Sequence, residues 1–159
     1  MRVLGIDPSS SCVGLALVVD GELAYTRIWK PSKPKDTHAN KLKEYEGWLK
    51  FQVKLANPDI AAVEQLNYAT RRIDVVRVIS YYEGVSLLVC AKRVAIVKSI
   101  MVSTARAHTL GKGNLSKEDS FKQVKRLFPK HKFRHFDQGG GDESDAAILA
   151  IAAPSVAEQ

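Results

Sequence analysis

The chain has 159 residues, of which 45% are hydrophobic and 26% charged, which is typical of a globular protein with one core. No apolar run approaches the roughly 20 residues needed to cross a bilayer and no signal peptide precedes the first strand, so we expect no membrane contact and a cytoplasmic location. A net charge of +7 favours a polyanionic partner such as nucleic acid, because lysine and arginine gain by displacing its counterions.

The first part of the chain predicts three strands. Residues 2–7 are apolar without alternation, as in a strand buried on both faces at the centre of a sheet. Strands over 12–19 and 23–29 are separated by Asp20-Gly21, a two-residue turn in which both positions tolerate positive φ. The three strands therefore form an antiparallel meander, which a proline-containing loop over 31–34 ends.

Helices then alternate with short strands. A helix over 36–56 stops at Asn57-Pro58-Asp59, and a fourth strand over 60–64 is expected parallel to the first because no hairpin turn precedes it. A long helix over 70–91 is apolar nearly all round in its second half, so it is either deeply buried or shared with another subunit. The fifth strand is predicted over 94–97, and an extension as far as 102 is the alternative.

The last part predicts a loop and two helices. Residues 104–115 are polar and contain glycines, which favours a loop. A helix over 116–128 has Ser116 as its N-cap, and three glycines lead into a last helix over 142–153. The element order predicts one α/β domain over residues 1–159, with a five-stranded mixed sheet flanked by helices and the first strand in its middle.

Four carboxylates stand where these elements begin or end. Asp7 and Glu64 leave the carboxyl ends of neighbouring parallel strands, where ligands bind in such sheets. Asp142 and Asp145 are three residues apart and share one face of the last helix. Four carboxylates this close would repel one another without a cation, and hard oxygen ligands suit Mg²⁺ or Mn²⁺. Two such ions roughly 3.5–4 Å apart can hold the attacking and leaving oxygens of a phosphodiester.

Each acid also has an ordinary structural interpretation. Asp7, which precedes a proline, could simply start a turn, and Glu64 could be an exposed strand end. The two acids of the last helix could only favour its N-terminus, and Glu143 between them is expected to face solvent. Cys12 and Cys90 have no metal-ligand spacing and are expected to be reduced thiols.

Three motifs resemble the signature of RuvC-type Holliday junction resolvases in the RNase H-like superfamily: Gly5-Ile6-Asp7-Pro8-Ser9, Val63-Glu64-Gln65 and Asp142-x-x-Asp145-Ala146. They occur in the family's order and spacing over nearly the whole chain. The resemblance implies an RNase H-like fold and a homodimeric endonuclease of DNA recombination and repair. Such an enzyme cuts four-way DNA junctions by paired symmetric nicks and leaves 5′-phosphate and 3′-hydroxyl ends.

The resemblance also implies two Mg²⁺ ions per active site, for which Mn²⁺ could substitute. By position, Asp7 would bridge the ions, and Glu64, Asp142 and Asp145 would complete their shell. Lys117 matches a family lysine at the start of a helix, and its implied role is phosphate positioning or charge stabilisation in the transition state. Its alternative is an exposed helix lysine. The helix over 70–91 matches the family's dimer helix.

One position departs from the family. Bacterial members often have a phenylalanine that stacks at the junction centre, whereas this chain has Asn67 followed by Tyr68, which could stack on a base or merely pack in its loop. Compact phage members often show relaxed sequence choice, so a phage origin, in a bacterial host cytoplasm, fits the chain. The residues that could line DNA, or equally form a solvated surface, are Arg71, Arg72, Arg106, Lys112, Lys117, Lys122, Lys125, Lys130, Lys132 and Arg134.

Other functions compete with junction resolution. The same acids could serve a broad branched-DNA nuclease or a nuclease of RNA–DNA hybrids. The chain could also be a non-catalytic module that binds junctions. Actin-like phosphotransfer, which also begins with an Asp-bearing strand, is disfavoured because that fold needs two such domains and far more chain.

Overall fold

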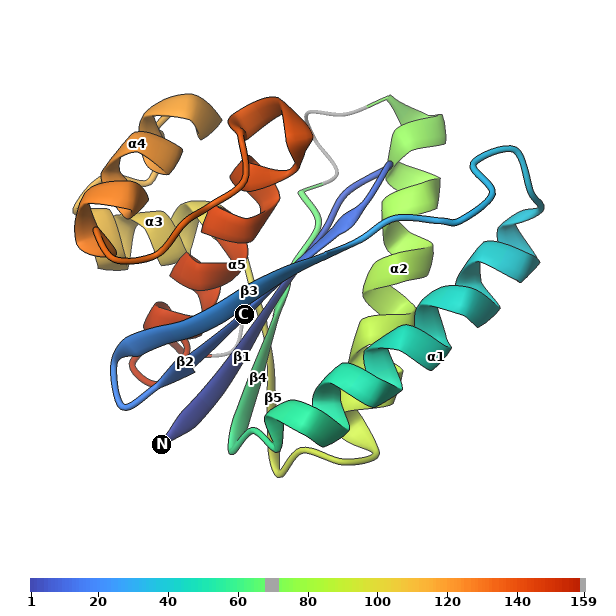
Figure 1. Cartoon of the computed structure of the whole chain (residues 1–159), viewed down its shortest axis with the longest axis horizontal. Helices are drawn as coiled ribbons and strands as arrows, with labels where there is room; N and C mark the ends of the chain where they lie inside the picture. The colour runs from blue at the N-terminus through green and yellow to red at the C-terminus, as the bar shows by residue number, and fades with distance from the viewer. Residues whose placement is uncertain (68–71, 158–159) are drawn as a thin grey trace.

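The structure is a computed structural model that describes residues 1–67 and 72–157. In this part of the chain, one sheet has the strand order β3-β2-β1-β4-β5 (Figure 1). Its strands are β1 (Arg2–Pro8), β2 (Val13–Val19), β3 (Glu22–Trp29), β4 (Ile60–Glu64) and β5 (Ile96–Ile100). The β1–β2 and β2–β3 pairs are antiparallel, whereas the β1–β4 and β4–β5 pairs are parallel. The predicted five-stranded mixed sheet with a central first strand is confirmed.

The turn between β2 and β3 has the backbone that its sequence requires. Asp20 has a φ of 50° and Gly21 a φ of 86°. Positive φ at both central residues gives the tight turn whose twist matches that of paired strands. The turn therefore fixes the register of the antiparallel meander.

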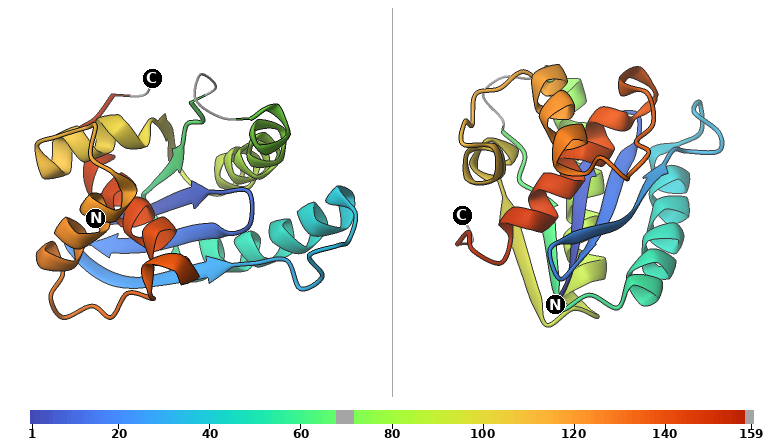
Figure 2. Two further views of the ribbon diagram at one scale, coloured as in Figure 1. Left: turned by 90° about the horizontal axis from the view of Figure 1, so that it is seen from above. Right: turned by 60° about the vertical axis from the view of Figure 1, so that its left-hand side comes forward.

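Helices cover both faces of the sheet. Figures 1 and 2 show α1 (His38–Ala56) and α2 (Ile73–Ala91) on one face. The other face carries α3 (Val102–Leu110), α4 (Lys117–Leu127) and α5 (Gly140–Ala152), with a short 3₁₀ turn over Phe136–Gln138 before α5. None of the described helices is long and apolar enough to cross a membrane.

The central strand contributes to a core on each face. Leu4 and Ile6 pack with the aromatic side chains Tyr45 and Tyr82 on the α1–α2 side. Val3 packs on the other side against α5, in a core rich in alanine. Because side chains alternate along a strand, a continuous apolar run is what burial on both faces demands.

Several predicted boundaries were wrong. Residues 102–110, assigned partly to a loop over 104–115, form α3. Gly111, taken as a loop signal, is the left-handed C-cap of that helix, with a φ of 75°. The fifth strand, predicted over 94–97 with an extension as far as 102, lies at Ile96–Ile100, so only its start was wrong, and α5 begins at Gly140 rather than at 142. The helix predicted over 70–91 begins at Ile73 in the structure, and residues 70–71 lie outside the described part.

Candidate active site

The parallel pairing of β1 and β4 brings the first two acids together. Ile6 is in register with Val63, so the next residues, Asp7 and Glu64, lie side by side at the carboxyl ends of these two strands. Their exposed fractions are only 3% and 9%. The alternatives of a simple turn residue and an exposed strand end therefore do not describe their surroundings.

Two glycines let α5 lie directly on the sheet beside these acids. A Cβ atom at Gly14 would lie 2.3 Å from the carbonyl oxygen of Asp142, and one at Gly5 would lie 1.9 Å from that of Ala146. Gly14 is also paired with Asp7 across the β1–β2 hairpin. The missing side chain on β2 therefore places the first turn of α5, with Asp142 and Asp145, next to the end of β1.

Lys117, the first residue of α4, reaches into this group of acids. Its Nζ lies 3.8 Å from Asp7 Oδ2 and 3.7 Å from Asp145 Oδ2, and it donates a hydrogen bond to Asp142 Oδ1. Ser116 caps α4 by accepting a hydrogen bond from the Asp119 backbone N–H at 3.0 Å. The cap predicted from the sequence thus fixes where the lysine side chain leaves its helix.

Burial makes the ionised acids depend on nearby cations. Burial, reinforced by the charge of Glu64, raises the pKa of Asp7 well above its ordinary value, although Lys117 opposes the shift. Burial and the charge of Asp7 raise the pKa of Asp145 to about 6. For Lys117, burial alone would lower the pKa, but Asp7, Asp145 and Asp142 together raise it. The acids therefore form a pocket that favours positive charge.

Arg106 holds Asp145 rather than facing DNA. Its Nη2 donates hydrogen bonds to Asp145 Oδ2 at 2.8 Å and to Oδ1 at 2.9 Å, and its Nε also donates to Oδ1. Its Nη1 bonds the carbonyl of Leu115, and the residue is only 8% exposed. The interpretation of Arg106 as a DNA contact was wrong, because its guanidinium is buried against Asp145. A basic residue in a predicted loop gives no sign of such a buried partner.

Cys12 is a contact of the site that sequence reasoning missed. Its Sγ donates a hydrogen bond to Asp142 Oδ2 at 2.8 Å, across 130 positions of the chain. Burial, reinforced by this hydrogen bond to Asp142, raises the pKa of the thiol to about 11, so it stays a donor at neutral pH. Ser9 closes the turn around it, since the Ser9 hydroxyl donates to the Cys12 carbonyl at 2.9 Å. Cys12 and Cys90 are both free thiols, as expected.

Glu143 was expected to face solvent, and that prediction was wrong. It is 3% exposed, and its carboxylate accepts hydrogen bonds from the backbone N–H of Arg134 at 3.0 Å and from Arg134 Nε at 3.3 Å. The helix has no solvent-facing side here, because the sheet, α3, α4 and the segment before α5 surround it. Glu143 thus ties that segment to the start of α5.

The other predicted DNA contacts stay predictions, and two of them form local ion pairs. Arg72 is exposed and pairs with Asp74, and Lys122 pairs with Glu118. Asn67 lies just beyond β4, whereas Tyr68 and Arg71 lie outside the described residues. The remaining basic residues with exposed side chains are Lys112, Lys125, Lys130, Lys132 and Arg134.

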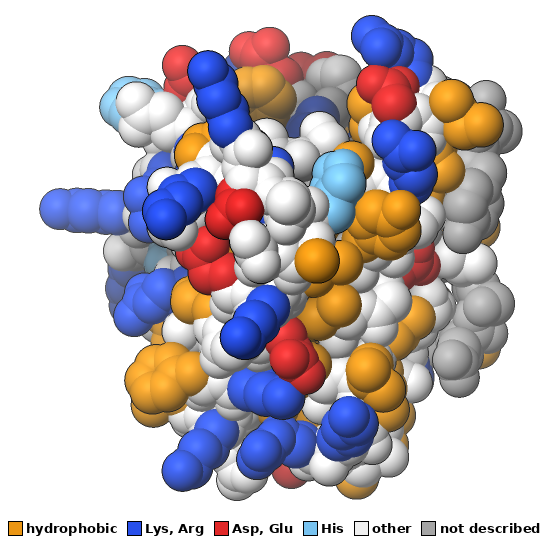
Figure 3. All heavy atoms as spheres, turned by 90° about the vertical axis from the view of Figure 1, so that its right-hand side faces the viewer, with side chains coloured by type: hydrophobic (Ala, Val, Ile, Leu, Met, Phe, Trp, Pro, Cys, Tyr) orange, Lys and Arg blue, Asp and Glu red, His pale blue; other side chains and the backbone are white. Residues whose placement is uncertain are grey.

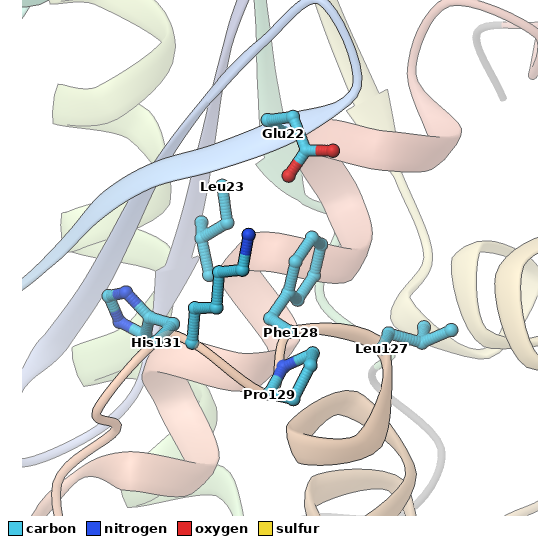
Figure 4. A pocket seen from close by; sticks show the side chains of 7 residues that line it. Glu22, Leu23, Leu127, Phe128, Pro129 and His131 are labelled. Atoms are coloured by element: carbon cyan, nitrogen blue, oxygen red, sulfur yellow. The ribbon is translucent and has the colours of Figure 1, made fainter.

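A pocket away from the acids is lined by Leu23, Phe128, Pro129 and His131, with Glu22 at its edge (Figure 4). Its volume is about 240 Å³. Glu22 and Leu23 begin β3. The start of β3 lies beside the start of β1, at the other end of the strands from Asp7. This pocket therefore plays no part in the candidate site.

The chemistry of the acidic site suits a divalent metal. Among the described residues, no group of three acidic, histidine or cysteine side chains is already arranged to bind a metal ion. The Lys117 ammonium lies between Asp7, Asp142 and Asp145 instead. Yet the Oδ2 atom of Asp7 is buried without a hydrogen-bond partner, and a buried carboxylate needs a cation or donors. Clustered carboxylate oxygens are the ligands that Mg²⁺ and Mn²⁺ prefer.

Comparison with known proteins agrees with this architecture. No family model matches the sequence. The chain is similar to the crossover junction endodeoxyribonuclease RuvC of Gluconobacter oxydans, with 31% identity over 156 residues that cover 95% of this chain and 88% of that protein.

Solved structures show the same fold at lower identity. Thermus thermophilus RuvC in complex with a Holliday junction substrate has a TM-score of 0.78 at 19% identity, covering 95% of this chain and 91% of that one. The yeast mitochondrial Holliday junction resolvase Ydc2 has a TM-score of 0.65 at 12% identity, covering 94% and 76%. Given the sequence identity to a RuvC protein over almost its full length, this chain belongs to the RuvC family of crossover junction endodeoxyribonucleases.

Proposed function

We propose that this protein is a metal-dependent endonuclease that resolves four-way DNA junctions by paired symmetric nicks. The observation that carries the proposal is the convergence of Asp7, Asp142 and Asp145 on one cationic group, Lys117 Nζ, at the carboxyl end of β1. Glu64 lies beside them at the end of β4. Membership of the RuvC family supports the reaction and the junction substrate.

In this proposal Asp7, Glu64, Asp142 and Asp145 hold two Mg²⁺ ions, with Mn²⁺ able to substitute. When bound, such ions activate a water nucleophile and stabilise the leaving oxygen of a phosphodiester. Arg106, which bonds both oxygens of Asp145, and Cys12, which donates to Asp142 Oδ2, keep these two carboxylates in fixed orientations. The Lys117 side chain is 40% exposed, so its ammonium can turn from the carboxylates to a phosphate oxygen. There it offsets negative charge in the transition state.

Paired nicks need two active sites, so the proposal includes a homodimer formed through α2. Three large apolar side chains of this helix are exposed: Ile73 by 87%, Leu88 by 53% and Tyr81 by 39%. Figure 3, which looks onto α1 and α2, shows hydrophobic side chains in a band bordered by lysines and arginines. Leu88→Lys should shift sedimentation toward the monomer and convert paired nicks into single ones. A cytoplasmic location belongs to the same proposal.

The direct test is cleavage of a labelled synthetic four-way junction with and without Mg²⁺. Forks, RNA–DNA hybrids and linear duplex at equal salt serve as competing substrates. Asp7→Asn should abolish nicking and leave junction binding intact or tighter, because a negative charge near phosphate is lost. Asp59→Asn is the matched control and should cut normally. Asp59 lies just before β4, at the other end of that strand from Glu64.

Three outcomes would overturn the proposal. Continued cutting by Asp7→Asn would exclude Asp7 as a metal ligand. Faster cleavage of hybrids than of junctions would assign the protein to another substrate class. Junction binding without any product in Mg²⁺ or Mn²⁺ would make it a binding module.

A further inference from the structure

A second pocket opens at the same edge of the sheet as the acids, on the side of α1 and α2. Strands β1 and β3 both pair antiparallel to β2, so they point the same way and end at this edge. The turn after β1 and the connection after β3 therefore lie near each other, and Figure 1 shows the tip of the β1–β2 hairpin beside α2. Within that turn, Cys12 faces Asp142, whereas Ser10 and Ser11 line the pocket.

The pocket is basic and has an apolar floor. Its volume is about 420 Å³. The residues that line it are Ser10, Ser11, Lys30, Pro31, Pro34, His38, Lys41, Val78 and Tyr82. None of these described lining residues is acidic, and neither lysine forms an ion pair within residues 1–67 and 72–157. Two ammonium groups and two hydroxyls around an apolar surface are suited to phosphate groups joined by the carbon framework of a sugar.

The segment that carries Lys30 is fixed in place. The Glu44 carboxylate of α1 accepts hydrogen bonds from the Ser32 backbone N–H at 3.0 Å and from its hydroxyl at 3.0 Å. Thr37 caps α1, and Asp36 accepts from the Thr37 N–H and from the Asn40 side chain. Asp36 and Glu44 keep their negative charges while they accept these bonds, but residues 30–44 hold five lysines against these two acids, so the charge around the pocket stays positive.

We propose that this pocket binds the phosphate backbone of the DNA that continues from the acidic site, on the side of the β3–α1 connection. The inference rests on the proposed function, because it extends the path of the strand whose phosphate reaches Asp7. Lys30 and Lys41 contact phosphates, and the serine hydroxyls donate to their oxygens. These contacts contribute affinity without reading sequence, since phosphate contacts carry no base information.

The test is the salt dependence of junction binding, measured in EDTA so that the result does not depend on cleavage. Each lost phosphate contact lowers the magnitude of the slope of log K against log salt by about 0.9. Lys30→Ala/Lys41→Ala should therefore lower the magnitude of this slope by up to about 1.8. The ratio of wild-type to variant affinity should then fall about tenfold as the salt concentration rises from roughly 50 to 200 mM. The matched control, Lys43→Ala/Lys54→Ala, removes two exposed lysines of α1 that do not line the pocket and should leave the slope unchanged.

An unchanged slope in the Lys30→Ala/Lys41→Ala variant would overturn the inference. If the slope is unchanged and the monomer–dimer equilibrium of that variant has shifted, the pocket belongs instead to a contact between two copies of the chain. Lys30→Arg/Lys41→Arg keeps the charges and should retain the wild-type slope. If the wild type binds junctions without cutting them, the proposed nuclease function fails, while the slope still decides the pocket.

Discussion

Replacing Gly14 with alanine tests whether the acids depend on close contact between β2 and α5. The new Cβ would lie 2.3 Å from the Asp142 carbonyl oxygen and 2.5 Å from its carbonyl carbon, both backbone atoms that cannot rotate away. Ordinary contact begins near 3.4 Å, so α5 must retreat by about 1 Å at Asp142. A shift of about 1 Å at a reacting centre lowers the rate on the order of 10²-fold. Overpacking of this kind also lowers the free energy of unfolding by roughly 1–3 kcal/mol.

The assay for this variant is single-turnover cleavage of a labelled four-way junction at saturating protein, with urea denaturation in parallel. Gly47→Ala in α1 is the matched control, because nothing lies within 4 Å of its added Cβ. Alanine in a helix interior is favoured over glycine by roughly 0.5–1 kcal/mol, so the control should be slightly more stable and cut normally. A Gly14→Ala protein that is as stable and as fast as the wild type would refute the reasoning.

Three further predictions concern the groups around the acids. Arg106→Met should lower the free energy of unfolding by roughly 3–5 kcal/mol, because buried Asp145 loses all its hydrogen bonds from Arg106 and keeps only the more distant charge of Lys117. Urea denaturation at neutral pH should show no such loss if the pair is dispensable. Cys12→Val removes the hydrogen bond to Asp142 and should weaken Mg²⁺ binding in calorimetry, whereas Cys12→Ser keeps a donor and should recover it; equal affinities in the two variants would contradict the role. In EDTA, the free energy of unfolding should fall as pH rises from about 4 to about 6, by at most about 1.36 kcal/mol per pH unit for each group, because burial raises the folded-state pKa of Asp145 to about 6 and also that of Asp7. Excess Mg²⁺ should flatten this profile, and a profile already flat in EDTA would exclude the raised pKa values.

The strands and the acids at their ends could be predicted because their signals are local. A continuous apolar run such as residues 2–7 needs cover on both faces, and the Asp20-Gly21 turn fixes its pairing. Helix α3 was missed because Val102–Leu110 has no apolar stripe. It is buried through Ala105 and the guanidinium of Arg106.

The partners of the acids could not be predicted because their signals are long-range. Arg106 meets Asp145 across 39 positions and Cys12 meets Asp142 across 130, and nothing adjacent to either residue marks the pairing. Glu143 was misjudged for a related reason. Helical spacing turns it away from Asp142, but only the tertiary structure shows that the side to which it turns is also covered.

The separation of Gly14 from Asp142 has a consequence for how the enzyme is made. The hairpin of β1 and β2 is synthesised early, and its acid has no partners on α5 until that helix follows more than a hundred residues later. A nascent chain can therefore build most of the sheet while it is still unable to cut DNA. Ribosome-bound chains stalled before α5 should be inert, so nuclease activity arises only once α5 has been synthesised and has packed on the sheet.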